Sequence, residues 1–128
     1  MRSGFKTECT DRLTRSNSRL TVKTAQTEAK LRQNMAASLL TSEAIKALEH
    51  TLPAWRVVDG ALERQWSFPD FVRAWGFMTQ VALIAQAMDH HPNWSNVYGS
   101  VTIRLSTHDL GGLSDLDLTL AQAIDQLS

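Results

Sequence analysis

Apolar side chains recur with helical spacing in three stretches of the chain. Residues 42–52 carry a narrow apolar stripe and end at Pro53, which cannot continue a helix. Residues 67–89 begin with an S-x-x-D capping pattern, and their wide apolar stripe requires a large apolar surface to pack on. Residues 114–127 begin with a second S-x-x-D pattern. Three capped helices are therefore predicted.

Between the helices, apolar residues gather on either side of turn-forming pairs. Asp59-Gly60 separates two short runs rich in Trp and Val, which predicts a β-hairpin. Gly99-Ser100 divides a second, alternating run in the same way. The resulting order α-β-β-α-β-β-α predicts an α+β fold, in which a four-stranded antiparallel sheet carries three helices packed on one face.

Charge is divided unevenly along the 128 residues, although the formal net charge is zero. Residues 1–34 hold eight basic and three acidic side chains, whereas residues 35–128 hold five and ten. The basic part is rich in Ser and Thr and poor in aromatic residues, so it cannot bury enough apolar surface to offset its ordering entropy. We expect residues 1–39 to form a flexible basic N-terminal tail and residues 40–128 to form the domain.

Other interpretations of this tail stay open. An Arg-rich, Ser-containing segment with few acidic residues is typical of an organellar transit peptide. Translation could instead begin at Met35, and the tail could also be a nucleic-acid-binding arm, although no nucleic-acid partner is expected. We expect a cytoplasmic protein, or an organellar one if residues 1–34 are a transit peptide. No apolar run approaches the roughly 18 residues of a membrane span, so no membrane partner is expected.

The candidate chemistry lies in the segment AMDHHPNW and in a later histidine. Three of the four histidines fall between His90 and His108. If Gly99-Ser100 is a two-residue loop, Tyr98 faces Val101, and the same ladder continued outward pairs His91 with His108. His90 can approach from the end of the preceding helix. The register therefore predicts that three histidines share one pocket.

Clustered imidazoles suit proton transfer. Imidazole has a reference pKa of about 6.5, and neighbouring imidazoles resist simultaneous protonation, which favours one acid and one base in the same site. No serine or cysteine is evidently paired with the histidines as a nucleophile, since Cys9 lies in the tail. An acid–base site is favoured over a three-histidine metal site and over no function. Asp117 can also be a simple helix cap, and Trp55 and Trp94 can be core residues or pocket walls.

Four motifs, in order and spacing, carry a resemblance to a known family: DHHPNW, NVY, LSTHD and GLSDLD. From about Leu40 onward the chain resembles the pterin-4a-carbinolamine dehydratases, also called dimerization cofactors of a homeodomain transcription factor. The resemblance implies dehydration of 4a-hydroxytetrahydrobiopterin to the quinonoid dihydropterin, which recycles the pterin of aromatic amino-acid hydroxylases. It implies no metal or organic cofactor and a homodimer or homotetramer. The family's four-stranded antiparallel sheet and three helices agree with the predicted elements.

The resemblance also implies the site residues. It makes His90, His91 and His108 the active-site histidines, with His90 and His108 favoured for proton transfer and His91 for pterin binding. Contacts with the pterin are implied for six further residues: Asp89, Trp55, Trp94, Thr107, Asp109 and Asp117. Gln86 stands where animal members carry a glutamate, so any charge effect of that group is absent here.

Two rival functions stay open beside this lyase. A small oligomer of this fold could be a binding module for a partner helix or a transcription factor. A histidine-only metal enzyme is the other rival, and metal analysis of the purified protein would separate it from a metal-free lyase.

Overall fold

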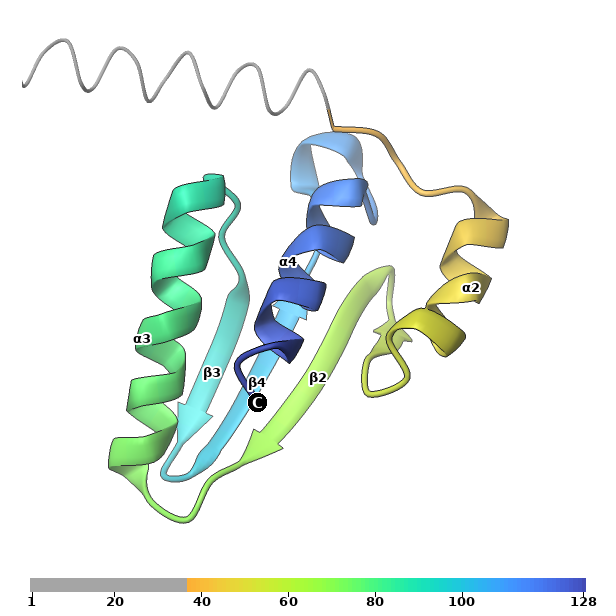
Figure 1. Cartoon of the computed structure of the whole chain (residues 1–128). Helices are drawn as coiled ribbons and strands as arrows, with labels where there is room; N and C mark the ends of the chain where they lie inside the picture. The colour runs from red at the N-terminus through yellow and green to blue at the C-terminus, as the bar shows by residue number, and fades with distance from the viewer. Residues whose placement is uncertain (1–36) are drawn as a thin grey trace, which may run out of the picture. The chain divides into compact units, whose positions relative to one another are not determined.

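The secondary structure follows the predicted order in a computed structural model that describes residues 37–128 (Figure 1). A single 3-10 turn, η1, connects the last strand to the last helix. The elements are α2 (Ser42–Thr51), β1 (Arg56–Val58), β2 (Ala61–Ser67), α3 (Phe71–Met88), β3 (Asn93–Val97), β4 (Ser100–Leu105), η1 (His108–Leu110) and α4 (Asp115–Asp125). The predicted α+β fold is confirmed.

The four strands form one antiparallel sheet in the order β1-β2-β4-β3. Figure 1 shows α4 in front of the central strands, with α3 and α2 to either side of it. On β4, Val101, Ile103 and Leu105 are almost fully buried among the helices' apolar residues, which include Leu120 and Ile124 of α4. Because side chains alternate along a strand, the polar residues between them lie on the other face of the sheet.

The first hairpin turns where the sequence predicted. Val58 pairs with Ala61, which leaves Asp59 and Gly60 as a two-residue loop. Their φ angles are 49° and 74°, so both loop residues lie in the left-handed region. A tight hairpin loop of this kind favours Asp or Asn followed by Gly. Local turn chemistry was therefore enough to place this hairpin.

The second hairpin turns one residue earlier than predicted. Val97 pairs with Ser100, so the loop is Tyr98-Gly99 and the prediction that Tyr98 faces Val101 is wrong. The physical reason is a tertiary contact: the Gly99 carbonyl accepts the Phe68 N–H at 2.7 Å. A Cβ on Gly99 would lie 2.2 Å from the Phe68 carbonyl oxygen, so only glycine fits at this point of the loop.

The start of α3 also differs from the prediction. The N-cap is Asp70, whose side chain accepts the Arg73 N–H at 2.8 Å. Ser67, predicted as part of the cap, is the last residue of β2 and pairs with Ser100. The sheet therefore extends through the position that the sequence pattern assigned to the helix cap.

The other helix ends match the expected signals. Thr41 caps α2, and its hydroxyl accepts the Ala44 N–H at 3.1 Å. Ser114 and Asp117 form the capping box of α4. α3 ends before Asp89, which adopts the left-handed conformation with a φ of 50°. This left-handed residue ends the helix and leads the chain into the histidine pair.

The expected tail lies outside the described residues as far as residue 36, and its boundary stays a prediction. The described residues next to it contact the loop before α4. Ser38 accepts the Asp115 N–H at 3.1 Å, and the Leu40 N–H donates to Leu113 at 2.9 Å. Within residues 37–128, no helix combines the length and the apolar character needed to cross a membrane.

Candidate active site

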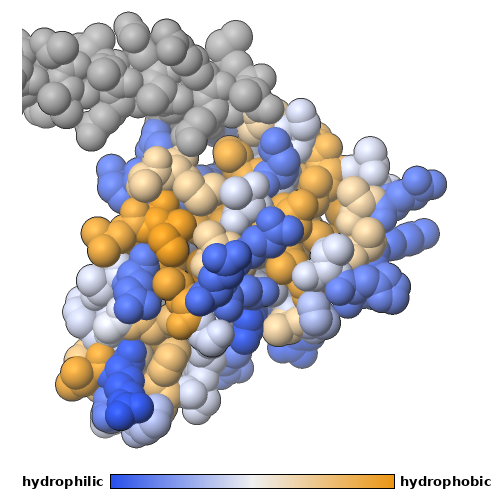
Figure 2. Space-filling view, viewed as in Figure 1, coloured by the Kyte–Doolittle hydropathy of each residue, from blue (hydrophilic) through white to orange (hydrophobic). Residues whose placement is uncertain are grey.

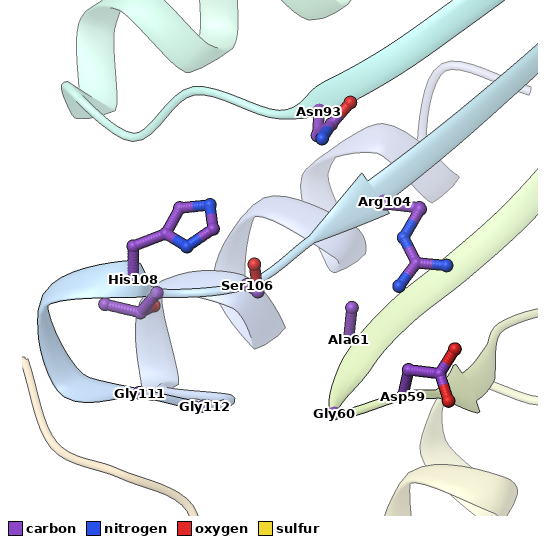
Figure 3. Close-up of a pocket in the computed structure, with 10 residues that line it drawn as sticks. Asp59, Gly60, Ala61, Asn93, Arg104, Ser106, His108, Gly111 and Gly112 are labelled. Carbon is purple, nitrogen blue, oxygen red and sulfur yellow. The ribbon is translucent and has the colours of Figure 1, made fainter.

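Two adjoining cavities open where β4 runs into η1. The smaller, of about 320 Å³, is lined by His91 and His108 together with Trp94. The larger, of about 340 Å³, is lined by His108 and extends to the β1–β2 turn (Figure 3). Four residues line both cavities: Asn93, Arg104, Ser106 and His108. A ligand bound beside the histidines can therefore extend into the larger cavity.

His91 and His108 both line the smaller cavity, but they are not paired across the strands. The β3–β4 ladder stops at the pair Asn93 and Arg104. His108 lies beyond the ladder, on η1. His91 is exposed, and its Nε2 lies 3.2 Å from Oε1 of Gln86. The two side chains thus line one cavity, although the register that suggested their pairing is wrong.

The third histidine has a different environment. The His90 ring contacts Asp117, which is hydrogen-bonded to Thr107 and Ser114, and we call these four residues the buried cluster. The Asp117 carboxylate is fully buried, and its Oδ1 lies 2.6 Å from His90 Nε2. Its Oδ2 accepts the Thr107 hydroxyl at 2.8 Å and the Ser114 N–H at 2.9 Å. The hydroxyls of Thr107 and Ser114 lie 2.6 Å apart.

The hydrogen bond to Asp117 decides which ring nitrogen of His90 faces the carboxylate. An ionised carboxylate only accepts hydrogen bonds, so His90 Nε2 carries the hydrogen of this pair and Nδ1 is the nitrogen left for another partner. A carboxylate so placed holds the ring in one orientation. Asp117 thus contacts His90 and caps α4 at once.

The other predicted residues divide into two groups. Thr107 lines the larger cavity, so it connects that cavity to the buried cluster. Asp89 and Asp109 are neighbours of the histidines in the chain. Asp89 is the C-cap of α3, and Asp109 lies within η1. Trp55 lies elsewhere: its indole N–H donates to an Asp125 carboxylate oxygen at 2.8 Å, and its ring is buried in the core. It is not among the residues that line either cavity.

Sequence reasoning missed Arg104, Asn93 and Ser106, which line both cavities. Arg104 is cross-strand partner to both Asn93 and Glu63, and its Nη1 donates to Glu63 Oε2 at 2.8 Å. The alternation of β4 places Arg104 on the face away from the helices. That alternation was visible in the sequence, but the cross-strand neighbours depend on a register that the sequence did not reveal.

The alternative of a three-histidine metal site has no matching set of ligands among residues 37–128. In the described part of the chain, no three His, Cys, Asp or Glu side chains are arranged to hold a metal ion. His90 is directed to a carboxylate, whereas His91 and His108 face the smaller cavity.

Comparison with known proteins identifies the family to which this domain is similar. Residues 38–127 match the family model described as pterin 4 alpha carbinolamine dehydratase. A protein of Synechococcus sp. strain WH7803, provisionally named a pterin-4-alpha-carbinolamine dehydratase, is 60% identical over 91 residues, which are 71% of this chain and 98% of that protein. A protein of Prochlorococcus marinus strain MIT 9313 with the same provisional name is 58% identical over 93 residues, covering 73% and 97%.

A solved structure agrees with these matches. It is the crystal structure of a transcriptional coactivator/pterin dehydratase from Brucella melitensis. The two chains are 37% identical, and the TM-score of their superposition is 0.67. The match covers 70% of this chain and 97% of the Brucella chain.

Proposed function

This chain belongs to the pterin 4 alpha carbinolamine dehydratase family, and from that premise we propose that it is a hydro-lyase that dehydrates 4a-hydroxytetrahydrobiopterin to the quinonoid dihydropterin. The observation that supports this activity best is the meeting of His91 and His108 at one cavity, beside a His90 held by a buried carboxylate. In the proposed physiological role, the reaction recycles the pterin used by an aromatic amino-acid hydroxylase.

The reaction needs an acid and a base but no electron transfer. The bond between C4a and its hydroxyl breaks, the N5 proton leaves, and a C4a=N5 double bond forms. The hydroxyl departs as water once it has received a proton. A proton donor and a proton acceptor positioned near one ring typically accelerate such a step by about 10²–10⁴-fold.

We assign the donor role to His108. It lines both cavities and is exposed, so its ring can approach a bound pterin from either one. Its position on the short η1 turn places it beyond the end of the ladder, where nothing in the sheet depends on it. His91 is proposed to hold the pterin, because its Nε2 is already engaged by Gln86 and its ring faces the smaller cavity.

His90 is proposed to accept or relay the N5 proton. The Asp117 carboxylate lies 2.6 Å from Nε2 and fixes the orientation of the ring, which leaves Nδ1 free to take up a proton. The side chain of His90 is only 11% exposed and lines neither cavity, so a relay fits its position better than direct attack on the substrate.

Four further residues are proposed to contact the pterin. Trp94 forms a wall of the smaller cavity, and Thr107 lines the larger one. Asp89 and Asp109 complete the set beside the histidines. Asp117 acts through the side chains it holds rather than by contact. Trp55 is left out, since its ring packs in the core.

The decisive experiment measures the dehydration rate of freshly generated 4a-hydroxytetrahydrobiopterin, with and without the full-length protein, after treatment with a chelator. We expect acceleration that survives the chelator. Acceleration that is lost with the chelator and restored by a divalent metal would overturn the metal-free mechanism. No acceleration in either sample would overturn the lyase and favour a binding module.

We also propose that the chain forms a homodimer or homotetramer through α3. The face of α3 away from the core carries large exposed apolar side chains: Val72 is 76% exposed, Trp75 57% and Leu83 69%. Figure 2 shows hydrophobic surface on the side of the molecule where α3 lies. A helix that is apolar on both faces buries the second face against a partner, here a second copy of the chain.

Light scattering after size-exclusion chromatography tests this assembly. The wild type should have the mass of a dimer or tetramer, and Trp75→Glu should be mainly monomeric. Ala47→Glu places the same charge on the exposed surface of α2 and should leave the mass unchanged. A monomeric wild type would contradict the proposal.

A further inference from the structure

Arg104 stands between the two cavities, and the proposed reaction gives it no role. Its side chain is 35% exposed and lines both cavities. Figure 3 shows Ser106 between His108 on one side and Arg104 on the other. A group that extends from a pterin beside the histidines towards the β1–β2 turn would therefore pass Arg104.

The guanidinium is fixed in place and still has donors to offer. Nη1 donates to Glu63 at 2.8 Å, and Nη2 donates to the Val58 carbonyl at 3.3 Å. A guanidinium carries five N–H groups in a planar arrangement. Three of them thus have no hydrogen-bond partner within residues 37–128. Because its orientation is already set, Arg104 would lose little entropy on binding a ligand.

The remaining lining is polar and offers both donors and acceptors. Asn93 has an amide, Ser106 has a hydroxyl, and Asp59 has a carboxylate at the far end of the larger cavity. Ala61 is the only residue with a purely apolar side chain among those that line it. Such a lining matches a group that can both donate and accept hydrogen bonds, as a hydroxyl does.

An anionic group matches the larger cavity less well. The charge of Arg104 is already neutralised by Glu63, and the Asp59 carboxylate lines the same space. An anion in this cavity would be repelled by the Asp59 carboxylate. Its attraction to Arg104 would be weakened because Arg104 is already paired with Glu63. Charge thus favours a neutral ligand group over a charged one.

We propose that the larger cavity is a subsite for a neutral, hydroxyl-bearing substituent of the pterin, and that Arg104 is the residue that determines this specificity. The proposal rests on the proposed function, because it requires the pterin ring to lie beside His91 and His108. The substituent is the one at C6, which is carried on the ring next to the reacting N5.

Equilibrium binding tests the subsite without depending on catalysis. The probes are 7,8-dihydrobiopterin, whose C6 side chain has two hydroxyls, and 6-methyl-7,8-dihydropterin, which has none. The wild type should bind the first about tenfold more tightly, as expected for hydrogen bonds to a charged donor. In Arg104→Met, which keeps the length but removes the donors, this ratio should fall close to one.

Two matched variants separate recognition from structure. Glu63→Gln breaks the ion pair but keeps the Arg104 donors, so most of the tenfold ratio should remain. Arg64→Met removes the neighbouring strand's arginine, which pairs with Asp125 and lines neither cavity, and should leave the ratio unchanged. An equal fall of the ratio in Arg64→Met would overturn a specific role for Arg104.

Other outcomes also decide the matter. A wild-type ratio near one overturns the subsite, even if the protein dehydrates its substrate well. A tenfold ratio that depends on Arg104 supports the subsite, even if no dehydration is seen and the lyase proposal fails. Tighter binding of pterin-6-carboxylate than of 7,8-dihydrobiopterin would overturn the choice of a neutral group. A protein that binds neither dihydropterin would overturn the inference outright.

Discussion

His90 and His91 are neighbours in the chain but lie in opposite environments. His90 belongs to the buried cluster, where every polar side chain has a hydrogen-bond partner and Asp117 is fully buried. His91 is exposed at the cavity, and its ring contacts the side chain of the exposed Gln86. A buried hydrogen-bonded network fixes the geometry of its members, and losing one member lowers the stability of the fold strongly. An exposed group can be changed with little effect on stability. The two regions should therefore respond differently to mutation.

The largest effect is expected from His108→Ala at the cavity. Because this histidine is proposed to protonate the departing hydroxyl, kcat should fall on the order of 10³-fold. Its exposed side chain contributes little to packing, so the free energy of unfolding should change by less than about 0.5 kcal/mol. Stopped-flow kinetics and urea denaturation measure the two quantities. His50→Ala, on the exposed surface of α2, is the matched control and should change neither.

Full activity in His108→Ala would remove the donor from the proposed mechanism. A large loss of stability would instead mean that the cavity and the buried cluster are not as distinct as their environments indicate.

The second prediction breaks the buried cluster. Asp117→Ala removes the partner of His90, the acceptor of Thr107 and the cap of α4, so we expect the free energy of unfolding to fall by about 3 kcal/mol. Asp115→Ala, in the same helical turn but exposed, should cost less than about 1 kcal/mol. Urea denaturation at neutral pH compares them. Equal losses would show that α4 depends on Asp117 no more than on a surface carboxylate.

A smaller loss of stability is expected at Thr107, which belongs to the buried cluster and also lines the larger cavity. Thr107→Val keeps the shape of the side chain but removes the hydroxyl that donates to Asp117, which should cost about 1–2 kcal/mol of stability. Thr119→Val removes an exposed hydroxyl on α4 and should be close to neutral. Thermal unfolding of both variants tests the difference. A neutral Thr107→Val would mean that another donor replaces the hydroxyl.

The smallest effect concerns the core. Trp55→Phe removes the hydrogen bond to Asp125 and part of a ring that packs 5.4 Å from Trp66, so stability should fall by about 1 kcal/mol. The KM for the pterin should not change, because Trp55 lines neither cavity. Steady-state kinetics beside urea denaturation separates these readouts. A raised KM with unchanged stability would return Trp55 to the binding site implied by the family resemblance.

The sequence predicted those features that depend on neighbouring residues. Asp59-Gly60 placed the first hairpin because both loop residues need positive φ angles, and the cap of α4 was readable from the S-x-x-D pattern. The second hairpin was shifted because the contact between Gly99 and Phe68 decides where its loop lies. Such a contact joins segments far apart in the chain, so no local pattern reveals it.

In the candidate site, too, features that depend on neighbouring residues were predictable and contacts between distant segments were not. The histidines could be grouped because they lie close in sequence and near the ends of predicted elements. The contact between His90 and Asp117 could not be foreseen, since it requires the end of α3 to meet the start of α4. Arg104 was missed because its role depends on which residues lie across the strand from it. The β3–β4 register was predicted wrongly, and the β2–β4 register was not predicted at all.

The Asp117 carboxylate has a further consequence for how the molecule opens. It joins the end of α3, the segment after β4 and the first turn of α4 through hydrogen bonds to three different residues. None of these segments can separate locally without leaving a buried carboxylate short of a partner. The amide hydrogen of Ser114, which donates to this carboxylate, should therefore exchange with solvent deuterium only when the whole domain unfolds. The buried cluster would then be among the last parts of the domain to open, although it lies next to the exposed His91 and His108 in the chain.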